Sequence, residues 1–330
     1  MPAVYVDRRD IRIEYAPGVL VLRGPDGPPQ RIPLAQVDYL LTRSNLSIDT
    51  AVLTHLAEQG SAVLLMDGRA GNRVAYVDGY RHGSAARRIR QYRAHLDPAF
   101  RLRMSRLLMI GKLRSQHRLL REALPQRPDQ RRNLLRGTQS LRAAMSSALR
   151  TDSIERLRGI EGAAAAAYFS AYAAILPPDC GFSGRNRRPP RDPVNAALSL
   201  GYSLLHADAL RAIRLAGLDP MLGVYHDLAP GRDSLACDLT ELHRAGVDRL
   251  VWRLFAEREL RADQFESLNG AVLMKKAARG SFYPAYETWA AARRTALLQR
   301  ALAYVKALPH GSDAADEGAP GPSEEPPCSP

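Results

Sequence analysis

The stretch Arg87–Leu124, with the sequence RRIRQYRAHLDPAFRLRMSRLLMIGKLRSQHRLLREAL, decides the fold of most of this chain. From about Ala85 onward the apolar residues recur every three or four positions, which is the period of an α-helix. The pattern predicts a long basic amphipathic helix that is broken at Pro125–Pro128. Its expected apolar anchors are Ile89, Tyr92, Leu96, Phe100, Leu107 and Leu108.

Helical signals continue from there to about Leu308. Asp152 or Ser153 can cap a later helix, because short polar side chains accept hydrogen bonds from the first free backbone N–H groups. Asp192 is a good cap for another, since Pro193 suits the first helical position. This part of the chain is therefore predicted to be all helical.

The first 80 residues have the pattern of β-strands instead. Short β-branched runs such as IRIEY and VAYV are separated by Gly, Pro and Asp, and one helix is expected between Asp49 as its cap and Gly60 as its end. A small domain with so many strands has edges to cover, which favours pairing with another chain. The prediction is an α+β protein with a β-rich dimerisation domain at 1–80, a helical catalytic and DNA-binding domain at 81–310 and a disordered acidic tail at 311–330.

The positive charge of the chain is concentrated in one segment. The net charge is +13, and Arg81–Arg158 alone holds 20 Lys and Arg against five Asp and Glu. Such a segment is typical of a surface that binds a polyanion, although it could also be a solvated helical face. Arg outnumbers Lys by 43 to 4, which suits bidentate phosphate contacts or reflects codon usage in a GC-rich genome.

Composition excludes several classes of protein. The longest uncharged run, Gly162–Pro178, falls short of the roughly 20 strongly apolar residues that cross a bilayer. The three cysteines, at positions 180, 237 and 328, are scattered, which argues against a disulfide framework and a cysteine-based zinc site. The chain opens on MPAVYVDRRD, which is not a secretory leader. A cytoplasmic protein with no membrane association is expected.

Three short clusters contain the residues that could perform chemistry. Glu161 lies in GIEGAAAAAYF, His226 ends DPMLGVYH, and Asp238 and Glu241 share one helical face in GRDSLACDLTELHR. Each cluster also has an ordinary explanation: a solvated or Arg-paired glutamate, a structural histidine and a solvated acidic face. Tyr168 lies seven residues after Glu161 and so on the same face.

Taken together, the clusters favour metal-assisted chemistry on a phosphodiester. Carboxylates with one imidazole suit Mg²⁺ or Mn²⁺, and such an ion neutralises phosphate oxygens. A basic surface to hold a nucleic-acid strand could come from Arg81–Arg158 and from Arg185, Arg187 and Arg188.

Four stretches resemble a known family in their order and spacing. They are EGAAAAAYF (161–169), GRNRRPPRDPVNAALSLGYSLL (184–205), LDPMLGVYH (218–226) and GRDSLACDLTELHR (231–244). The chain resembles the CRISPR-associated integrase and endonuclease, the catalytic subunit of the complex that inserts new spacers. The resemblance extends from the β-rich region to about residue 290.

The resemblance implies a fold, a reaction and partners. It implies a β-sandwich-like N-terminal domain that forms a homodimer, and a helical C-terminal domain that holds the site. Two such dimers are expected to be bridged by a small ferredoxin-like CRISPR-associated partner into a heterohexamer. The implied reaction is transesterification on double-stranded DNA, in which a 3′-hydroxyl of a captured fragment attacks a CRISPR repeat, and nuclease activity accompanies it.

The resemblance also assigns roles to individual residues. Glu161, His226 and Glu241 are implied to be catalytic metal ligands, with Asp238 as a second-tier ligand or water-holder. Tyr168 and Tyr202 are possible neighbours of the site. Arg232 and Arg244 flank the acids, and we expect one to pair with a carboxylate while the other faces phosphate. Two alternatives stay open: a non-catalytic nucleic-acid-binding scaffold, and a repair nuclease that cuts without joining.

Overall fold

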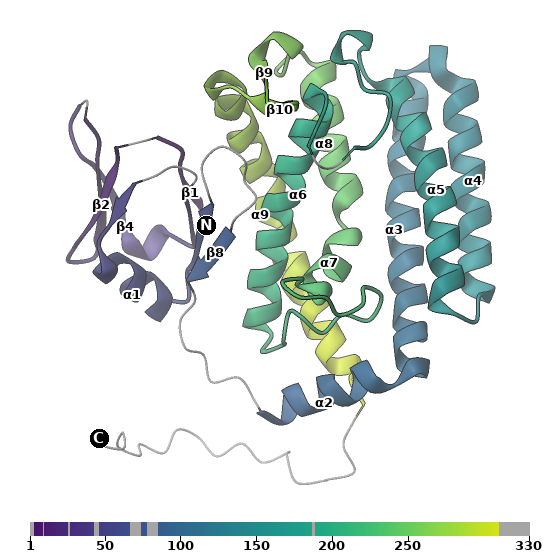
Figure 1. Cartoon of the computed structure of the whole chain (residues 1–330), viewed down its shortest axis with the longest axis horizontal. Helices are drawn as coiled ribbons and strands as arrows, with labels where there is room; N and C mark the ends of the chain where they lie inside the picture. Colours follow the sequence, from purple (N-terminus) through teal and green to yellow (C-terminus); the bar gives the residue numbers. More distant parts are fainter. Residues whose placement is uncertain are drawn as a thin grey trace.

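The computed structural model describes residues 3–8, 10–25, 27–42, 46–66, 74–77, 85–186 and 189–309. Figure 1 shows a small β-rich part, formed by the N-terminal residues, beside a larger bundle of helices. This arrangement confirms the predicted α+β fold in two domains. The domain limit at residue 80 and the acidic tail at 311–330 lie outside the described residues.

The N-terminal part contains two four-stranded sheets within the described residues. One sheet has the order β1 (Ala3–Val6), β5 (Tyr39–Thr42), β7 (Ala62–Met66) and β8 (Val74–Val77), and its first three strands run parallel. The other has the order β4 (Gln30–Pro33), β3 (Val19–Arg23), β2 (Arg12–Ala16) and β6 (Ser47–Ile48). Helix α1 (Thr50–Glu58) contacts both sheets, through β2 and β7. Their common core is apolar and fully buried, and it includes Ile13, Leu20, Leu40, Leu56 and Val63.

The long helix expected over Arg87–Leu124 is two helices. α2 (Ala85–Leu96) ends before Asp97, whose side chain accepts a hydrogen bond from Ala99 N at 2.9 Å and so caps α3 (Pro98–Gln126). Proline disfavours a helical conformation in the residue before it, which explains the break. Four of the six predicted anchors are therefore wrong, because only Phe100 is buried and Leu108 half-buried. Ile89, Tyr92, Leu96 and Leu107 are exposed.

The remaining helices form the bundle that holds the candidate site. They are α4 (Arg131–Arg150), α5 (Ile154–Ile175), α6 (Pro193–Leu215), α7 (Ser234–Glu241), α8 (Arg244–Ala256) and α9 (Lys276–Ala307). Two predicted caps are confirmed: Ser153 accepts from Arg156 N at 3.2 Å, and Asp192 accepts from Asn195 N at 2.8 Å. Within the described part of the chain, none of the helices is both long and apolar enough to cross a bilayer.

A hairpin interrupts the helices and was not predicted. Strands β9 (Phe265–Leu268) and β10 (Ala271–Met274) pair antiparallel on either side of Asn269 and Gly270. Both turn residues have positive φ, of 52° and 75°. Asn-Gly is the dipeptide most typical of such a turn, so the sequence contained a signal for this hairpin.

Strand β1 attaches the N-terminal part to the helical bundle. The Tyr5 hydroxyl donates to Glu287 Oε2 at 2.9 Å, and its ring stacks on Tyr283 of α9 with centroids 4.8 Å apart. Arg279, also on α9, forms an ion pair with Asp7 just after the strand. These contacts fix the β-rich part against α9.

Candidate active site

Three helices meet at a buried cluster of charges. Lys112 of α3 extends its ammonium group between Glu161 of α5 and Glu241 of α7. Its Nζ donates a hydrogen bond to Glu161 Oε1 and lies 2.7 Å from Glu241 Oε2. The Lys112 and Glu241 side chains are 9% and 3% exposed, while Glu161 is 24% exposed. The structure thus brings together two of the three predicted ligands, from distant parts of the sequence.

The other oxygen of each carboxylate is held as well. Tyr225 donates its hydroxyl hydrogen to Glu161 Oε2, and Arg244 Nη1 lies 2.9 Å from Glu241 Oε1. Glu241 Oε2 is buried and, within the described residues, accepts no well-oriented hydrogen bond even though the ammonium of Lys112 is close. Each carboxylate therefore directs one oxygen at a common point, where a cation is required.

Two glycines allow the elements of the site to approach one another. A Cβ at Gly111, beside Lys112, would lie 2.5 Å from Cδ2 of Leu242, so glycine lets α3 close on the end of α7. A Cβ at Gly223 would lie 2.8 Å from Asp238 Oδ2. At Gly223 the backbone of Ser234 is as close, at 2.8 Å, so glycine is required there, whereas at Gly111 the flexible end of Leu242 would have to move.

Asp238 organises the segment that leads to His226. Its Oδ2 accepts from the backbone N–H groups of Val224 and Tyr225 at 2.6 and 3.1 Å, and its Oδ1 accepts from His226 N at 3.1 Å. The same Oδ1 lies 2.6 Å from His226 Nδ1. This contact holds the imidazole through Nδ1 and leaves Nε2 as the nitrogen that could bind an ion, an arrangement common in metal sites. Asp238 is therefore placed to position His226.

Both carboxylates of the cluster are ionised near neutral pH. Burial raises the pKa of Glu241, but Arg244 and Lys112 outweigh that effect and hold it at about 2. Burial also opposes ionisation of Glu161, whose pKa is nevertheless lowered by Lys112 and by the Tyr225 hydroxyl.

The donor set fits a hard divalent cation. Two carboxylate oxygens aimed at one buried positive charge are the ligands that Mg²⁺ and Mn²⁺ prefer, and His226 Nε2 would tilt the set toward Mn²⁺. In the described residues, however, no three His, Cys, Asp or Glu side chains already stand close enough together to hold an ion. The ammonium of Lys112 occupies the point where the two carboxylates meet. The metal set of Glu161, His226, Glu241 and Asp238 stays a prediction.

The two tyrosines predicted near the site share a second buried carboxylate, Asp248. Tyr168 donates to Asp248 Oδ2 at 2.6 Å, and Tyr202 donates to Oδ1. Burial raises the pKa of Asp248 to about 6, although the two hydroxyl groups lower it. Arg244 lies over the Tyr202 ring at 5.0 Å while it pairs with Glu241. The tyrosines are thus linked to the charged cluster through Arg244.

The predicted DNA-contacting arginines are in different settings. Arg244 pairs with a carboxylate, as we expected of one member of the flanking pair, and Arg232 is exposed. Arg185 is held within the protein: it donates to Asn195 Oδ1 at 2.7 Å and to Ser199 Oγ at 3.1 Å. Arg187 and Arg188 lie outside the described residues.

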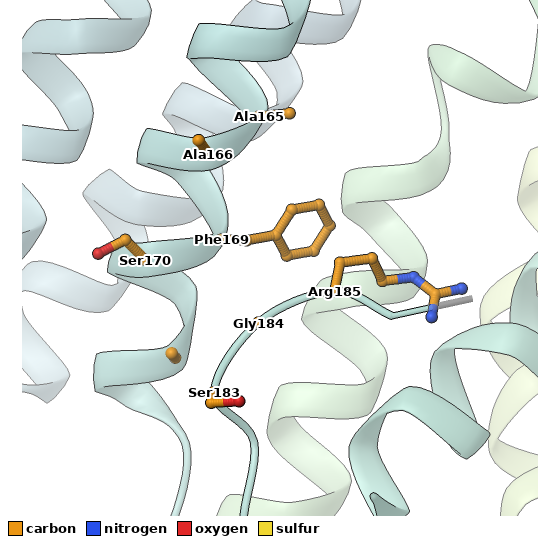
Figure 2. Close-up of a pocket in the computed structure, with 8 residues that line it drawn as sticks. Ala165, Ala166, Phe169, Ser170, Ser183, Gly184 and Arg185 are labelled. Atoms are coloured by element: carbon orange, nitrogen blue, oxygen red, sulfur yellow. The ribbon is translucent and has the colours of Figure 1, made fainter. Parts of the chain in front are cut away.

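A pocket of about 450 Å³ lies beside the site, between α5 and the segment around Arg185. Figure 2 shows Phe169 extending from α5 toward Arg185, with the small side chains of Ala165 and Ala166 on the same helix. Ala165 is about one helical turn after Glu161, although no residue of the charged cluster lines the pocket itself. Apart from Phe169 and Arg185, the residues that line it are small.

Sequence reasoning missed Lys112 and the role of Tyr225. In the sequence, Lys112 is only one of the basic residues of Arg81–Arg158, and Tyr225 is only the residue before His226. One signal was available for Lys112, because it is the single lysine among the arginines of residues 81–158. Nothing in the sequence alone indicates that Tyr225 donates to Glu161.

A histidine next to α7 predicts a pH dependence of stability. His206 Nε2 lies 3.2 Å from Asp233 Oδ2, at the start of α7. Burial lowers the pKa of His206, but hydrogen bonds to Asp233 and Cys237 outweigh it and raise the pKa to about 9. A histidine in the unfolded chain has a pKa near 6.5. The His206–Asp233 pair therefore stabilises the folded state fully below pH 6.5, and this stabilisation is lost as the pH rises through about 9.

We expect His206→Gln to lower the melting temperature by about 3 °C at pH 6, for a loss of about 1 kcal/mol. The difference in melting temperature between the variant and the unmodified protein should shrink above pH 7 and vanish by about pH 10. Thermal melts of both proteins between pH 6 and pH 10 measure it. A deficit that is constant or grows with pH would contradict the ion pair.

Comparisons with known proteins agree with this architecture. The family model described as CRISPR associated protein Cas1 matches residues 4–288. A relative from Thermodesulfovibrio yellowstonii, named CRISPR-associated endonuclease Cas1 1, is 38% identical over 89% of this chain and 93% of its own length. CRISPR-associated endonuclease Cas1 3 of Thermus thermophilus is 34% identical over 77% of this chain and 74% of its own length.

Solved structures share the fold at lower identity. A Cas1 protein from Thermotoga maritima superposes with a TM-score of 0.82 at 21% identity, over 93% of this chain and 97% of its own. A casposase bound to integration product has a TM-score of 0.78 at 20% identity, over 98% of this chain and 96% of its own. The likeness covers both the β-rich part and the helical bundle.

Proposed function

This chain belongs to the Cas1 family of CRISPR-associated proteins, and from that premise we propose that it is a divalent-metal-dependent DNA integrase and endonuclease. Its proposed reaction joins a 3′-hydroxyl of a captured DNA fragment to a phosphodiester of a CRISPR repeat. The observation that carries the proposal is the pairing of half-buried Glu161 with buried Glu241, each with one oxygen directed at the same cation, the ammonium of Lys112. The names of the relatives support a nuclease, and the casposase neighbour supports an integrase fold.

Glu161, Glu241 and His226 would hold the ion, with Asp238 fixing the imidazole. A bound Mg²⁺ or Mn²⁺ supplies charge neutralisation at phosphate oxygens and makes a bound hydroxyl easier to ionise. Tyr225 and Arg244 keep the two carboxylates in place from their outer oxygens. The oxygens left for the ion are Glu161 Oε1 and Glu241 Oε2, which face Lys112 in the structure.

The proposed joining step exchanges one phosphodiester for another. The 3′-oxygen of the captured strand forms a new bond to phosphorus, the bond to the 3′-oxygen of the repeat breaks, the attacking hydroxyl loses its proton to solvent, and the leaving oxygen gains one. No net hydrolysis occurs, so no energy source is required. The hydrolytic reaction differs only in that water replaces the 3′-hydroxyl.

The pocket beside α5 supports an approach route for a DNA end. It starts about one turn from Glu161, and its alanines allow a sugar-phosphate chain to come close to the helix. Phe169 offers a ring on which a base could stack. We propose that the attacking 3′ end lies along this wall of α5.

DNA binding is proposed to use the basic helices. Helices α3 and α4 carry a row of exposed arginines. They are Arg114, Arg118 and Arg121 on α3, and Arg131, Arg132, Arg136 and Arg142 on α4. Each arginine that neutralises a phosphate releases counterions, so affinity must fall as salt rises.

We expect replacement of Arg114, Arg118 and Arg121 by Gln to reduce the slope of log affinity against log salt by up to about 2.7, because each lost phosphate contact contributes about 0.9. Fluorescence anisotropy with a labelled duplex between 50 and 200 mM salt measures the slope. The matched control replaces Arg253, Arg258 and Arg261, which are also exposed but pair with Glu257, Asp179 and Asp263. Equal losses in the two triple variants would show that only net charge matters.

The assembly is proposed to be a heterohexamer. Homodimers would form through the N-terminal sheets, and a small ferredoxin-like partner would bridge two of them. A structural neighbour, of which this chain covers 35%, belongs to a Cas6-RT-Cas1–Cas2 complex, which supports a partner of this kind.

One experiment separates the proposal from a scaffold and from a repair nuclease. A labelled DNA fragment with either a 3′-hydroxyl or a 3′-deoxy end is incubated with the protein, its small partner, Mn²⁺ and a plasmid that carries a repeat. Joined product only with the hydroxyl supports integration. Cleavage without joining indicates a repair nuclease, and binding without either reaction indicates a scaffold.

A further inference from the structure

Lys112 is unusual among the basic residues of this chain. The segment Arg81–Arg158 contains 19 arginines and one lysine, and the other lysines of the chain, Lys275, Lys276 and Lys306, are exposed. Between Glu161 and Glu241 the chain places a compact ammonium on a flexible stem, whereas between Asp208 and Glu287 it places the planar guanidinium of Arg294. An ammonium can occupy the place of a metal ion and can withdraw from it.

The contacts of Lys112 are those that a cation ligated by Glu161 and Glu241 would make. Its Nζ is bound by Glu161 Oε1 and lies 2.7 Å from Glu241 Oε2. A carboxylate oxygen holds Mg²⁺ or Mn²⁺ at about 2.1 Å, so an ion on these two oxygens would take nearly the position of Nζ. Two positive charges cannot share that buried point, because their repulsion is weakly screened there.

We propose that Lys112 is an internal counter-ion, which a divalent cation displaces when it binds between Glu161 and Glu241. The inference rests on the proposed function, which requires that ion. Before metal binds, the ammonium neutralises the buried carboxylate of Glu241 and the half-buried one of Glu161, which would otherwise repel each other, and so it stabilises the fold. When metal binds, the ammonium has to leave, and this exchange weakens the apparent affinity for the ion.

The test measures metal affinity and thermal stability, both without any DNA substrate. Mn²⁺ is titrated calorimetrically into the full-length chain and into Lys112→Met, with Lys112→Gln as the alternative should the methionine variant fail to fold. We expect the variant to bind Mn²⁺ about tenfold more tightly and to melt at a lower temperature without metal. Mn²⁺ should also raise its melting temperature by more than it raises that of the unmodified chain, since an ion that binds only the folded state stabilises it.

Arg244→Met is the matched control, because it also removes one positive charge beside Glu241 but from the outer oxygen. Displacement predicts a gain in affinity for the Lys112 variant alone. An equal gain in Mn²⁺ affinity in both variants would show that the effect is the loss of any nearby positive charge, and it would overturn the proposal. An unchanged or weaker Mn²⁺ affinity in Lys112→Met would overturn it as well. If neither the unmodified chain nor Lys112→Met binds Mn²⁺, the metal-dependent function itself fails, which is a different result.

Discussion

Replacing Glu161 by Gln is expected to reduce strand transfer by about 1,000-fold while DNA affinity changes by less than about twofold. The substitution keeps the shape of the side chain and its contact with Tyr225 but removes one of the two charges directed at the cation. A metal ion that loses a carboxylate ligand no longer neutralises the reacting phosphate, and several kcal/mol of transition-state stabilisation correspond to about three powers of ten in rate. Joining of a labelled fragment to a repeat-bearing plasmid, at saturating DNA, measures the rate.

The same helix provides the control. Glu155 is an exposed glutamate in the first turn of α5, so Glu155→Gln makes the same chemical change away from the cluster. It should leave both strand transfer and DNA affinity within about twofold. If Glu161→Gln keeps more than about a tenth of the activity, Glu161 is not a ligand and the proposed centre is wrong.

Periodicity predicted the fold better than it predicted which residues are buried. The change from strands to helices and the caps at Ser153 and Asp192 depend on local chemistry, and the structure confirms them. The anchors on α2 failed because this helix buries a different face, with Gln91 and Ala94, and Leu107 on α3 is exposed as well. Local signals fix where helices begin, whereas burial is decided by packing between them.

The sequence predicted only those site residues that lie within the four stretches that resemble the family. The resemblance implies Glu161, His226 and Glu241 as ligands, and the structure brings the two glutamates to one cation, the ammonium of Lys112. Lys112 and Tyr225 complete that arrangement through contacts between elements that are distant in sequence, which spacing cannot predict. The resemblance implies that Asp238 is a second-tier ligand or water-holder, whereas in the structure its oxygens contact the backbone of residues 224–226 and the imidazole of His226.

Asp238→Asn is expected to weaken Mn²⁺ binding by about 10- to 100-fold and to destabilise the fold by about 3 kcal/mol. The carboxylate accepts three backbone N–H groups and contacts His226 Nδ1, so an amide turned toward them leaves buried donors without an acceptor. A supporting residue of this kind tunes affinity without contacting the ion. Calorimetric Mn²⁺ titration and urea unfolding of the variant measure the two effects.

Excess metal separates the two roles that Asp238 could have. If Asp238 only orients His226, high Mn²⁺ should refill the site and restore strand transfer in Asp238→Asn to within about tenfold, because Glu161 and Glu241 still supply their oxygens. Glu161→Gln should stay inactive at every ion concentration. If the two variants respond alike, Asp238 binds the ion directly, and its hydrogen bonds to the 224–226 backbone must then rearrange when the metal enters.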